Sequence, residues 1–180
     1  MTIALTEGIQ LYSGTYFDYG APERSDVTIE DIALALSHVC RFAGHVSRFY
    51  SVAQHCVNAS RLVAPQFAFT ALMHDTAEAV MNDIPTPLKI TVPAFKDLEV
   101  RIEQAMSSRF GFQFPLPAAV KIADLQMLKL ERDVLKPSAD EWEILAGIQT
   151  EAIAHLVDMS FWDSWSARQM FLKRYEELRP

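Results

Sequence analysis

The sequence predicts an all-α fold, a single compact bundle of about six or seven helices. Apolar residues recur at helical spacing in several long segments, and capping residues or prolines bound those segments. Glycine is scarce, with 6 in 180 residues, which disfavours a β-rich fold full of tight turns. Because 50% of the residues are apolar, we expect residues 1–180 to share one core and form one domain.

The N-terminal half divides into an irregular segment and three expected helices. Residues 11–26 are aromatic and rich in turn residues, so we expect an ordered loop or a short hairpin there. Thr28 and Asp31 form a capping-box pattern that begins a first helix over residues 29–42. A second helix is expected over about residues 51–63 and a third over about 66–81, with Pro65 as the break between them. These two helices should form an antiparallel hairpin.

Three further helices are expected in the C-terminal half. Residues 94–110 are amphipathic, and Gly111 follows them as a C-terminal stop. A helix over residues 117–136 is opened by Pro117 and closed by Pro137. The last helix, over residues 166–179, carries its apolar residues on one stripe.

Composition excludes several classes of partner. The chain has 23 acidic and 16 basic residues and no basic run, which argues against binding polymeric nucleic acid. No segment approaches the roughly 20 apolar residues of a membrane span, and the first residues do not resemble a signal peptide. Cys40 and Cys56 lie within apolar helical patterns, as buried thiols of a reducing compartment do. We therefore expect a cytoplasmic protein without a membrane partner.

One set of residues predicts a metal site: His55, the adjacent pair His74 and Asp75, and Asp124. His55 lies 10 residues before Pro65 and His74 lies 9 after it, so at ~1.5 Å rise per residue both imidazoles stand roughly 14 Å from the turn. Two imidazoles and two carboxylates suit one divalent transition metal, Zn²⁺, Co²⁺, Mn²⁺ or Fe²⁺, better than Ca²⁺ or Mg²⁺. Glu78, one helical turn after His74, is placed to orient a water molecule or move its proton.

Each of these residues also has a simpler interpretation when it is taken alone. A lone histidine on an apolar helix face is more often a hydrogen-bonded core residue than a ligand, and we interpret His38 and His155 in this way. A single helical aspartate such as Asp124 is usually solvated. The order histidine, His-Asp pair and aspartate, with Glu78 beside them, favours the metal site.

The pattern resembles the HD-domain metal-dependent phosphohydrolase superfamily, from roughly Leu11 to the last helix. Within it, the chain is similar to bacterial 5′-deoxynucleotidases and to the small dATP triphosphohydrolases of phages that replace adenine with diaminopurine. The shared motifs are filled here by Arg41-Phe42, Val52 to His55, His74 to Glu78, Asp83, and Thr86-Pro87-Leu88-Lys89. Phe42 stands where tryptophan is more usual, and the hairpin between His55 and His74 is shorter than in the bacterial enzymes.

The resemblance implies a role for each matched residue. His55, His74, Asp75 and Asp124 would hold one metal ion, and Glu78 would serve the attacking water. Arg41 and Lys89 would bind the phosphates, and Phe42 would pack on the nucleoside. The sequence leaves open whether a Mg²⁺ ion carried by the substrate phosphates also takes part. Asp83 would contact the sugar or brace the site, Pro87 belongs to the substrate-binding stretch, and Gly44 and His45 lie where the phage enzymes sense the sugar. Plain core packing for Phe42, a helix-terminal cation for Arg41 and a solvated Lys89 are the alternatives.

The expected function is a metal-dependent deoxynucleoside triphosphate triphosphohydrolase that converts dATP to deoxyadenosine and tripolyphosphate. The alternatives are a 5′-deoxynucleotidase acting on monophosphates and, from another class, a non-catalytic nucleotide-binding module. The partner would be a small deoxynucleotide, in the host cytoplasm if the chain is phage-encoded. The resembled families are dimers or hexamers, so we expect a homo-oligomer. We expect four aromatic residues near the N-terminus to be exposed, where they could form a lid or a subunit contact: Tyr12, Tyr16, Phe17 and Tyr19.

Overall fold

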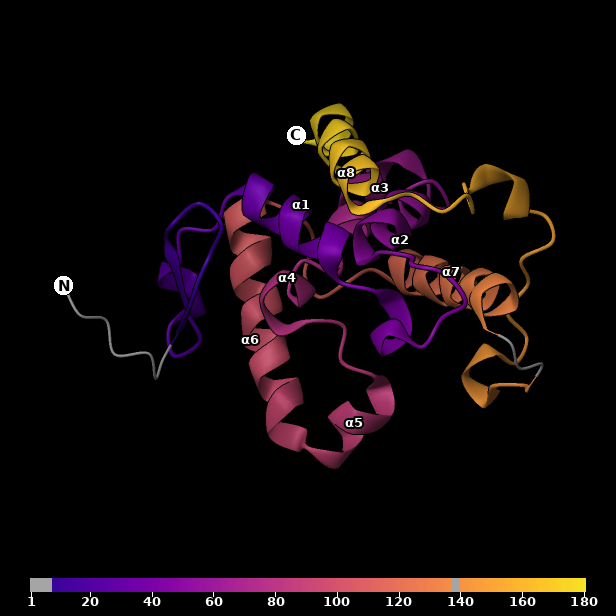
Figure 1. Ribbon diagram of the computed structural model, residues 1–180, viewed down its shortest axis with the longest axis horizontal. Helices are drawn as coiled ribbons and strands as arrows, with labels where there is room; N and C mark the ends of the chain where they lie inside the picture. The colour runs from indigo at the N-terminus through magenta and orange to yellow at the C-terminus, as the bar shows by residue number, and fades with distance from the viewer. Residues whose placement is uncertain (1–7, 137–139) are drawn as a thin grey trace.

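Helices dominate the computed structural model, which describes residues 8–136 and 140–180 (Figure 1). The α-helices are α1 (Ile29–His38), α2 (Val52–Ala59), α3 (Pro65–Met73), α4 (Glu78–Met81), α5 (Thr86–Thr91), α6 (Pro93–Phe110), α7 (Ala118–Leu135) and α8 (Ser164–Leu178). The strands β1 (Gly8–Gln10) and β2 (Tyr16–Asp18) form one antiparallel pair. The prediction of an all-α fold is confirmed. Residues 1–7 and Pro137, which entered the predictions about a signal peptide and a helix end, lie outside the described ranges.

Helix α1 begins with the capping box that the sequence predicts. The amide of Asp31 donates to Thr28 Oγ1 at 3.1 Å, and the amide of Thr28 donates to Asp31 Oδ2 at 3.0 Å. The helix ends at His38 and not at Phe42 as expected, because the chain then extends into an isolated bridge between Cys40 and Ser51. Arg41 and Phe42 therefore lie outside α1, in a loop whose residues Arg41–Gly44 form a short 3-10 turn.

The expected antiparallel hairpin is formed by α2 and α3, which pack against each other. Ser51 caps α2 by accepting a hydrogen bond from the amide of Gln54 at 3.2 Å. The helix ends at Ala59, four residues before the predicted end at residue 63. Pro65 occupies the first position of α3, where its missing amide hydrogen costs nothing.

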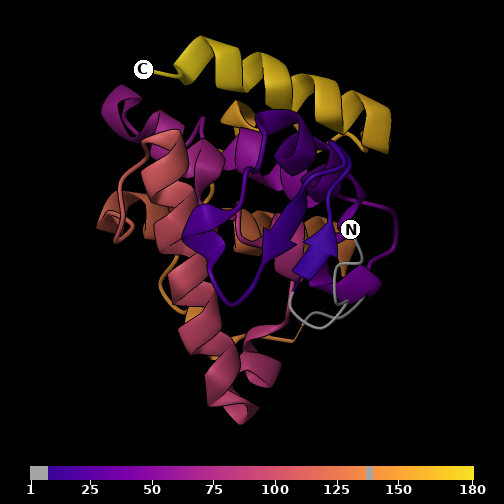
Figure 2. The same cartoon turned by 90° about the vertical axis from the view of Figure 1, so that its left-hand side faces the viewer.

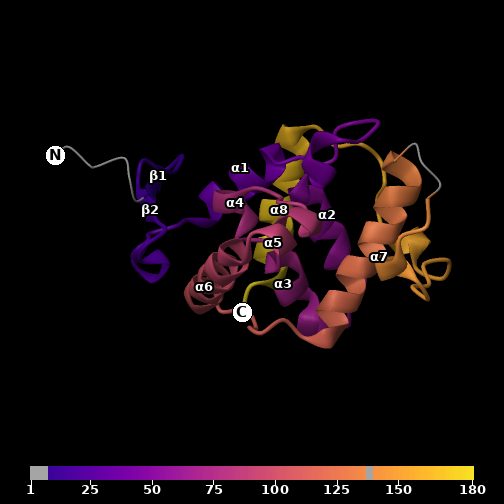
Figure 3. The ribbon, with the colours of Figure 1, turned by 90° about the horizontal axis from the view of Figure 1, so that it is seen from below.

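The remaining helices surround this hairpin. Helix α8 crosses the top of the molecule, where it packs against α1, α2 and α3 (Figures 1 and 2). Helix α5 and the adjoining end of α6 project below the body (Figure 1), and α7 lies on the side away from the β1–β2 hairpin (Figure 3). Gly111 ends α6 in the left-handed conformation, with φ of 79°, as its position in the sequence predicts. Helix α5 was not expected, because the short stretch from Thr86 to Lys89 has no helical periodicity of its own.

One cluster of buried apolar side chains joins the N-terminal hairpin to α8. It includes Phe17 of β2, Leu36 of α1, Ile102 of α6 and Phe171 of α8, all with 0% exposure. The expectation that Phe17 is exposed is therefore wrong. Neighbouring side chains on a strand point to opposite faces, so Phe17 enters the core while Tyr16 stays 38% exposed. None of the described helices is both long enough and apolar enough to cross a bilayer.

Candidate functional site

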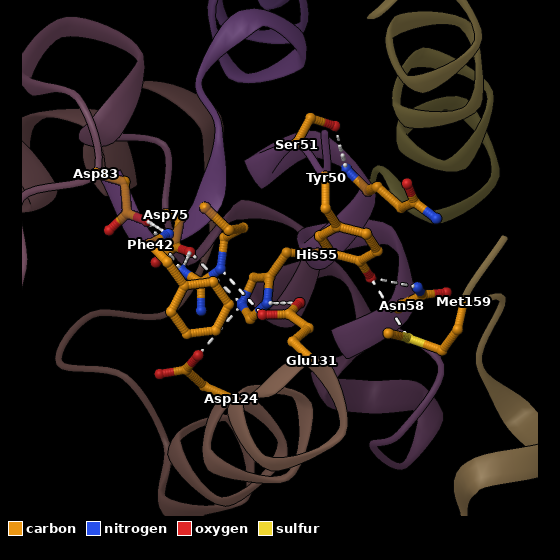
Figure 4. A network of polar contacts seen from close by, with 12 residues as sticks. Phe42, Tyr50, Ser51, His55, Asn58, Asp75, Asp83, Asp124, Glu131 and Met159 are labelled. Atoms are coloured by element: carbon orange, nitrogen blue, oxygen red, sulfur yellow. Dashed lines mark hydrogen bonds and ion pairs between the residues drawn. The ribbon is translucent and has the colours of Figure 1, made fainter. Parts of the chain in front are cut away.

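Four side chains from α2, α7 and the end of α3 converge inside the bundle, and Figure 4 shows three of them, His55, Asp75 and Asp124. The Nε2 atoms of His55 and His74 are 3.3 Å apart. Asp124 Oδ1 lies 3.2 Å from His55 Nε2 and 3.8 Å from His74 Nε2. Asp75 Oδ1 lies 3.3 Å from His74 Nε2. Because the ligand atoms of His55, His74 and Asp75 lie within 4.8 Å of one another, this group could hold a metal ion.

The two histidines direct their Nε2 atoms toward each other. His55 Nδ1 lies 2.7 Å from Glu131 Oε1, and His74 Nδ1 lies 2.7 Å from the carbonyl oxygen of Ala71. A carboxylate and a carbonyl only accept hydrogen bonds, so both Nδ1 atoms carry a hydrogen, and loss of the second ring proton leaves a lone pair at each Nε2. When both rings have lost that proton, the two lone pairs, 3.3 Å apart, repel each other unless a cation lies between them. The donor set therefore fits a divalent metal ion.

Around the four ligand side chains, negatively charged groups outnumber positively charged ones. The carboxylates are those of Asp75, Glu78, Asp83, Asp124 and Glu131, and the cation in contact with them is Arg41. Oδ2 of Asp75 and Oε2 of Glu78 are buried and have no hydrogen-bond partner in the described part of the chain. A buried carboxylate oxygen is costly to leave unpaired, so both atoms fit a site that takes up an ion or a polar ligand.

The surroundings move the pKa of Glu78 and the pKa of Asp124 in opposite directions. Burial raises the pKa of the Glu78 carboxyl well above its usual range, and the charge of Asp75 raises it further. Burial acts in the same direction on Asp124, but hydrogen bonds to the two histidines outweigh it and hold the pKa of Asp124 well below its usual range. Burial lowers the pKa of His74, yet the charge of Asp75 outweighs this effect and the pKa stands well above its usual value. Glu78 can thus carry a proton where Asp124 remains ionised.

The His-Asp pair lies in a turn with i to i+3 hydrogen bonds, which interrupts the helix predicted over residues 66–81. The prediction of one uninterrupted helix is wrong, because α3 ends at Met73 and α4 begins at Glu78. Between them, the amide of Thr76 donates to Met73 O at 3.2 Å and the amide of Glu78 donates to Asp75 O at 2.9 Å. In a turn with this three-residue spacing, side chains at i and i+3 stand one above the other. The tightening therefore places Asp75 and Glu78 on the same face.

The loop that follows Cys40 has a left-handed backbone. Phe42, Ala43 and Gly44 have φ values of 56°, 52° and 81°. This conformation costs an L-residue about 1–2 kcal/mol, and only glycine adopts it without strain. Two of the hydrogen bonds that hold the loop run from the amide of Arg41 to Tyr50 O at 2.9 Å and from the amide of Phe42 to Asp83 Oδ2 at 3.2 Å. These contacts aim the Arg41 side chain into the bundle.

Arg41 reaches the site but its guanidinium group is already bound to carboxylates. Only 8% of the residue is exposed. Its Nε donates to Glu131 Oε2 at 3.1 Å, and its Nη1 lies 3.7 Å from Asp83 Oδ2 and 4.0 Å from Asp75 Oδ2. Asp83 therefore braces the loop and the arginine, which is one of the two roles expected for it.

The other residues expected to bind substrate lie further from the ligand group. Lys89 of α5 forms an ion pair with Glu99 of α6, and burial lowers its pKa less than this partner raises it. Gly44 and His45 are exposed, as is Pro87 on α5. No contact seen among residues 8–136 and 140–180 joins these three to the four ligand positions. Phe42 is half-buried, and its ring packs edge-on against Trp142 with centroids 6.1 Å apart.

Three residues near the site were not predicted. Glu131 follows Asp124 by seven residues, which is two helical turns, so the shared face of α7 was a usable signal. Trp142 had no such signal, because it follows α7 and reaches Phe42 only through the fold. Burial raises the pKa of Glu103 on α6 to about 7, and the charges of Glu99 and Asp75 raise it as well.

The histidines and cysteines outside the ligand group differ in burial. The prediction that His38 and His155 belong to the core is wrong, because both are exposed. His38 Nδ1 lies 2.9 Å from Leu34 O, one turn back on α1, so its hydrogen bond is local. Cys56 is buried and Cys40 is half-buried, and both are free thiols. Burial raises the pKa of Cys56 to about 11, so this thiol stays protonated.

Two known proteins are similar to this chain over most of its length. The uncharacterized protein YfdR of Escherichia coli K12 is 41% identical over 171 residues, covering 94% of each chain. An uncharacterized protein of Rhodobacter capsulatus is 33% identical over 138 residues, covering 69% of this chain and 70% of that protein. No protein-family model matches the chain. Identity at this level over this length shows common descent, so the chain belongs to the family of YfdR and the Rhodobacter protein.

Proposed function

We propose that this protein is a metal-dependent phosphohydrolase of the HD-domain type that acts on deoxynucleotides. The observation that carries the proposal is the pair of Nε2 atoms of His55 and His74, 3.3 Å apart with their Nδ1 hydrogens engaged elsewhere. Asp75 and Asp124 complete a set of four ligands for one ion of the Zn²⁺, Co²⁺, Mn²⁺ or Fe²⁺ class. When bound, such an ion supplies Lewis acidity that activates water and offsets negative charge on phosphoryl oxygens.

Glu78 is the residue that we propose to move the proton. It shares a face with Asp75, and its buried Oε2 has no hydrogen-bond partner among the described residues. Because burial raises the pKa of Glu78, this carboxylate is a stronger base than an exposed one. In the hydrolysis of dATP, the water oxygen bonds to the α-phosphorus and the bond from phosphorus to the 5′-oxygen breaks. Glu78 takes a proton from the water and returns one to the 5′-oxygen, which leaves deoxyadenosine and tripolyphosphate.

Aromatic and cationic side chains beside the site support a nucleotide as the substrate. Phe42 packs edge-on against Trp142, and the Nζ of Lys136 lies 5.7 Å from the Phe42 ring centroid. An aromatic pair of this kind offers a surface on which a nucleobase can stack. Arg41, immediately before Phe42, would face the phosphate from inside the bundle. The dATP reaction is the one expected from the resemblance to the phage enzymes.

One observation favours a second candidate, a 5′-deoxynucleotidase that releases phosphate from monophosphates. The cations nearest the site already have partners: Arg41 contacts Glu131, Asp83 and Asp75, and Lys89 is paired with Glu99. A tripolyphosphate chain needs several cationic donors along its length, whereas a monophosphate needs few beyond the ion itself. The length of phosphate that the site accepts therefore separates the two reactions.

Product chromatography tests both candidates. The purified chain, loaded separately with Zn²⁺, Co²⁺ and Mn²⁺, is incubated with deoxynucleoside mono- and triphosphates and with ATP as the ribose control. We expect deoxyadenosine and tripolyphosphate from dATP. Inorganic phosphate from dAMP with dATP untouched would replace the first candidate by the second. If no nucleotide is hydrolysed with any of the ions, both are wrong and a non-catalytic binding module is left.

A further inference from the structure

Glu131 joins two parts of the site through its two carboxylate oxygens. Its Oε1 accepts from His55 Nδ1 at 2.7 Å, and its Oε2 accepts from Arg41 Nε at 3.1 Å. The side chain of Glu131 is fully buried on α7, beside His55 and to the right of Phe42 and Asp83 in Figure 4. Each oxygen thus has one strong partner, and the two partners come from different segments of the chain.

The first of these contacts determines how His55 faces the ligand group. An ionised carboxylate only accepts, so it keeps the ring hydrogen of His55 on Nδ1. The lone pair of the neutral ring is then at Nε2, which is 3.3 Å from His74 Nε2 and 3.2 Å from Asp124 Oδ1. A carboxylate in this position orients a metal-binding imidazole and increases its basicity.

The second contact determines where the Arg41 guanidinium lies. Because Nε is bound to Glu131, the Nη1 group turns toward Asp83 at 3.7 Å and Asp75 at 4.0 Å. The backbone of Arg41 is itself fixed, because its amide donates a hydrogen bond to Tyr50 O at 2.9 Å. Asp75 belongs to the ligand group, so Glu131 brings the arginine against that group.

We propose that Glu131 is a positioning residue that couples metal binding to phosphate binding, by orienting His55 for the ion and by holding Arg41 beside it. The part of the proposal that concerns His55 and the metal ion rests on the ligand group alone. The part that concerns Arg41 rests on the proposed function, because only a phosphate-bearing substrate would place an oxyanion beside Arg41. A single buried carboxylate then sets the geometry of both halves of the site.

Glu131→Gln tests the coupling because glutamine has one accepting oxygen and one donating amide. It cannot accept from His55 Nδ1 and Arg41 Nε together, so one contact must fail, and loss of the negative charge weakens the other. We expect Zn²⁺ affinity to fall about 10–100-fold, measured by competition with a chromophoric chelator. Inorganic phosphate affinity of the zinc-saturated protein, measured by calorimetry, should fall as well. Glu131→Asp keeps two acceptors and should restore part of both affinities.

The matched control is Asp133→Asn, the same chemical change on an exposed residue of α7 two positions away. Unchanged Zn²⁺ affinity in a folded Glu131→Gln variant would overturn the inference, and loss of Zn²⁺ affinity with unchanged phosphate affinity would overturn the coupling. Should that variant not fold, nitrogen-15 NMR of wild-type His55 at alkaline pH decides: we expect the hydrogen on Nδ1, and a hydrogen on Nε2 contradicts the proposal. These readouts use Zn²⁺ and phosphate without turnover, so they stand apart from a failure of nucleotide hydrolysis.

Discussion

Replacing His74 by alanine should remove the stabilisation of the fold by a divalent metal ion. The side chain of His74 is 3% exposed, and its Nδ1 is fixed by Ala71 O at 2.7 Å, so no other residue of that turn can take its place. For the wild type, free Zn²⁺ at 100 times its dissociation constant contributes about 2.7 kcal/mol to the free energy of unfolding. For a chain of this size, each kcal/mol raises Tm by roughly 2–4 °C, so we expect a rise of about 5–11 °C.

The variant should respond far less to the same metal concentration. If loss of one of the four ligands weakens binding at least about 100-fold, the same Zn²⁺ concentration is near the new dissociation constant and contributes about 0.4 kcal/mol. The expected rise in Tm is then about 1 °C. Differential scanning fluorimetry with and without Zn²⁺ measures both values, and His155→Ala is the control because that histidine is exposed and distant in sequence. An equal rise for His74→Ala and the wild type would refute the metal site.

Three further outcomes are expected. Glu78→Gln should lower kcat for the hydrolysed nucleotide at least about 100-fold while Zn²⁺ affinity is kept, and full activity in this variant would show that another group moves the proton. Thr28→Ala breaks the capping box of α1 and should lower the free energy of unfolding by about 1 kcal/mol in urea denaturation, whereas an unchanged midpoint would mean that the cap contributes nothing. Burial raises the pKa of Glu103 from its ordinary value of 4.5 to about 7, so the folded chain binds this proton more tightly than the unfolded chain. Stability from Glu103 is therefore present below about pH 4.5 and lost as the pH rises to about 7, and in metal-free protein Glu103→Gln should raise Tm at pH 8 but not at pH 4. Equal shifts at both pH values would contradict that assignment.

Local signals in the sequence predicted the order of most of the helices, but not α5 or the break between α3 and α4. The capping box at Thr28, Pro65 at the start of α3 and Gly111 after α6 act within a few residues, so the structure reproduces them. The convergence of His55 and His74 was also predictable, because two helices of similar length joined by a short turn bring equal heights together. The capping and periodicity rules do not describe tightened turns, and this is why the break between Met73 and Glu78 was missed.

The sequence by itself determined the all-α fold, the hairpin of α2 and α3 and the identity of the four residues that meet between helices. The fold, the hairpin and the pairing of His55 with His74 follow from periodicity, capping and spacing, whereas Asp124, on a separate helix, was assigned by the order histidine, His-Asp pair and aspartate. Only the tertiary structure decided that Arg41 is enclosed by Glu131, Asp83 and Asp75, and that Trp142 reaches Phe42. Those contacts join residues far apart in the chain, and long-range packing and charge pairing are established only when the helices assemble.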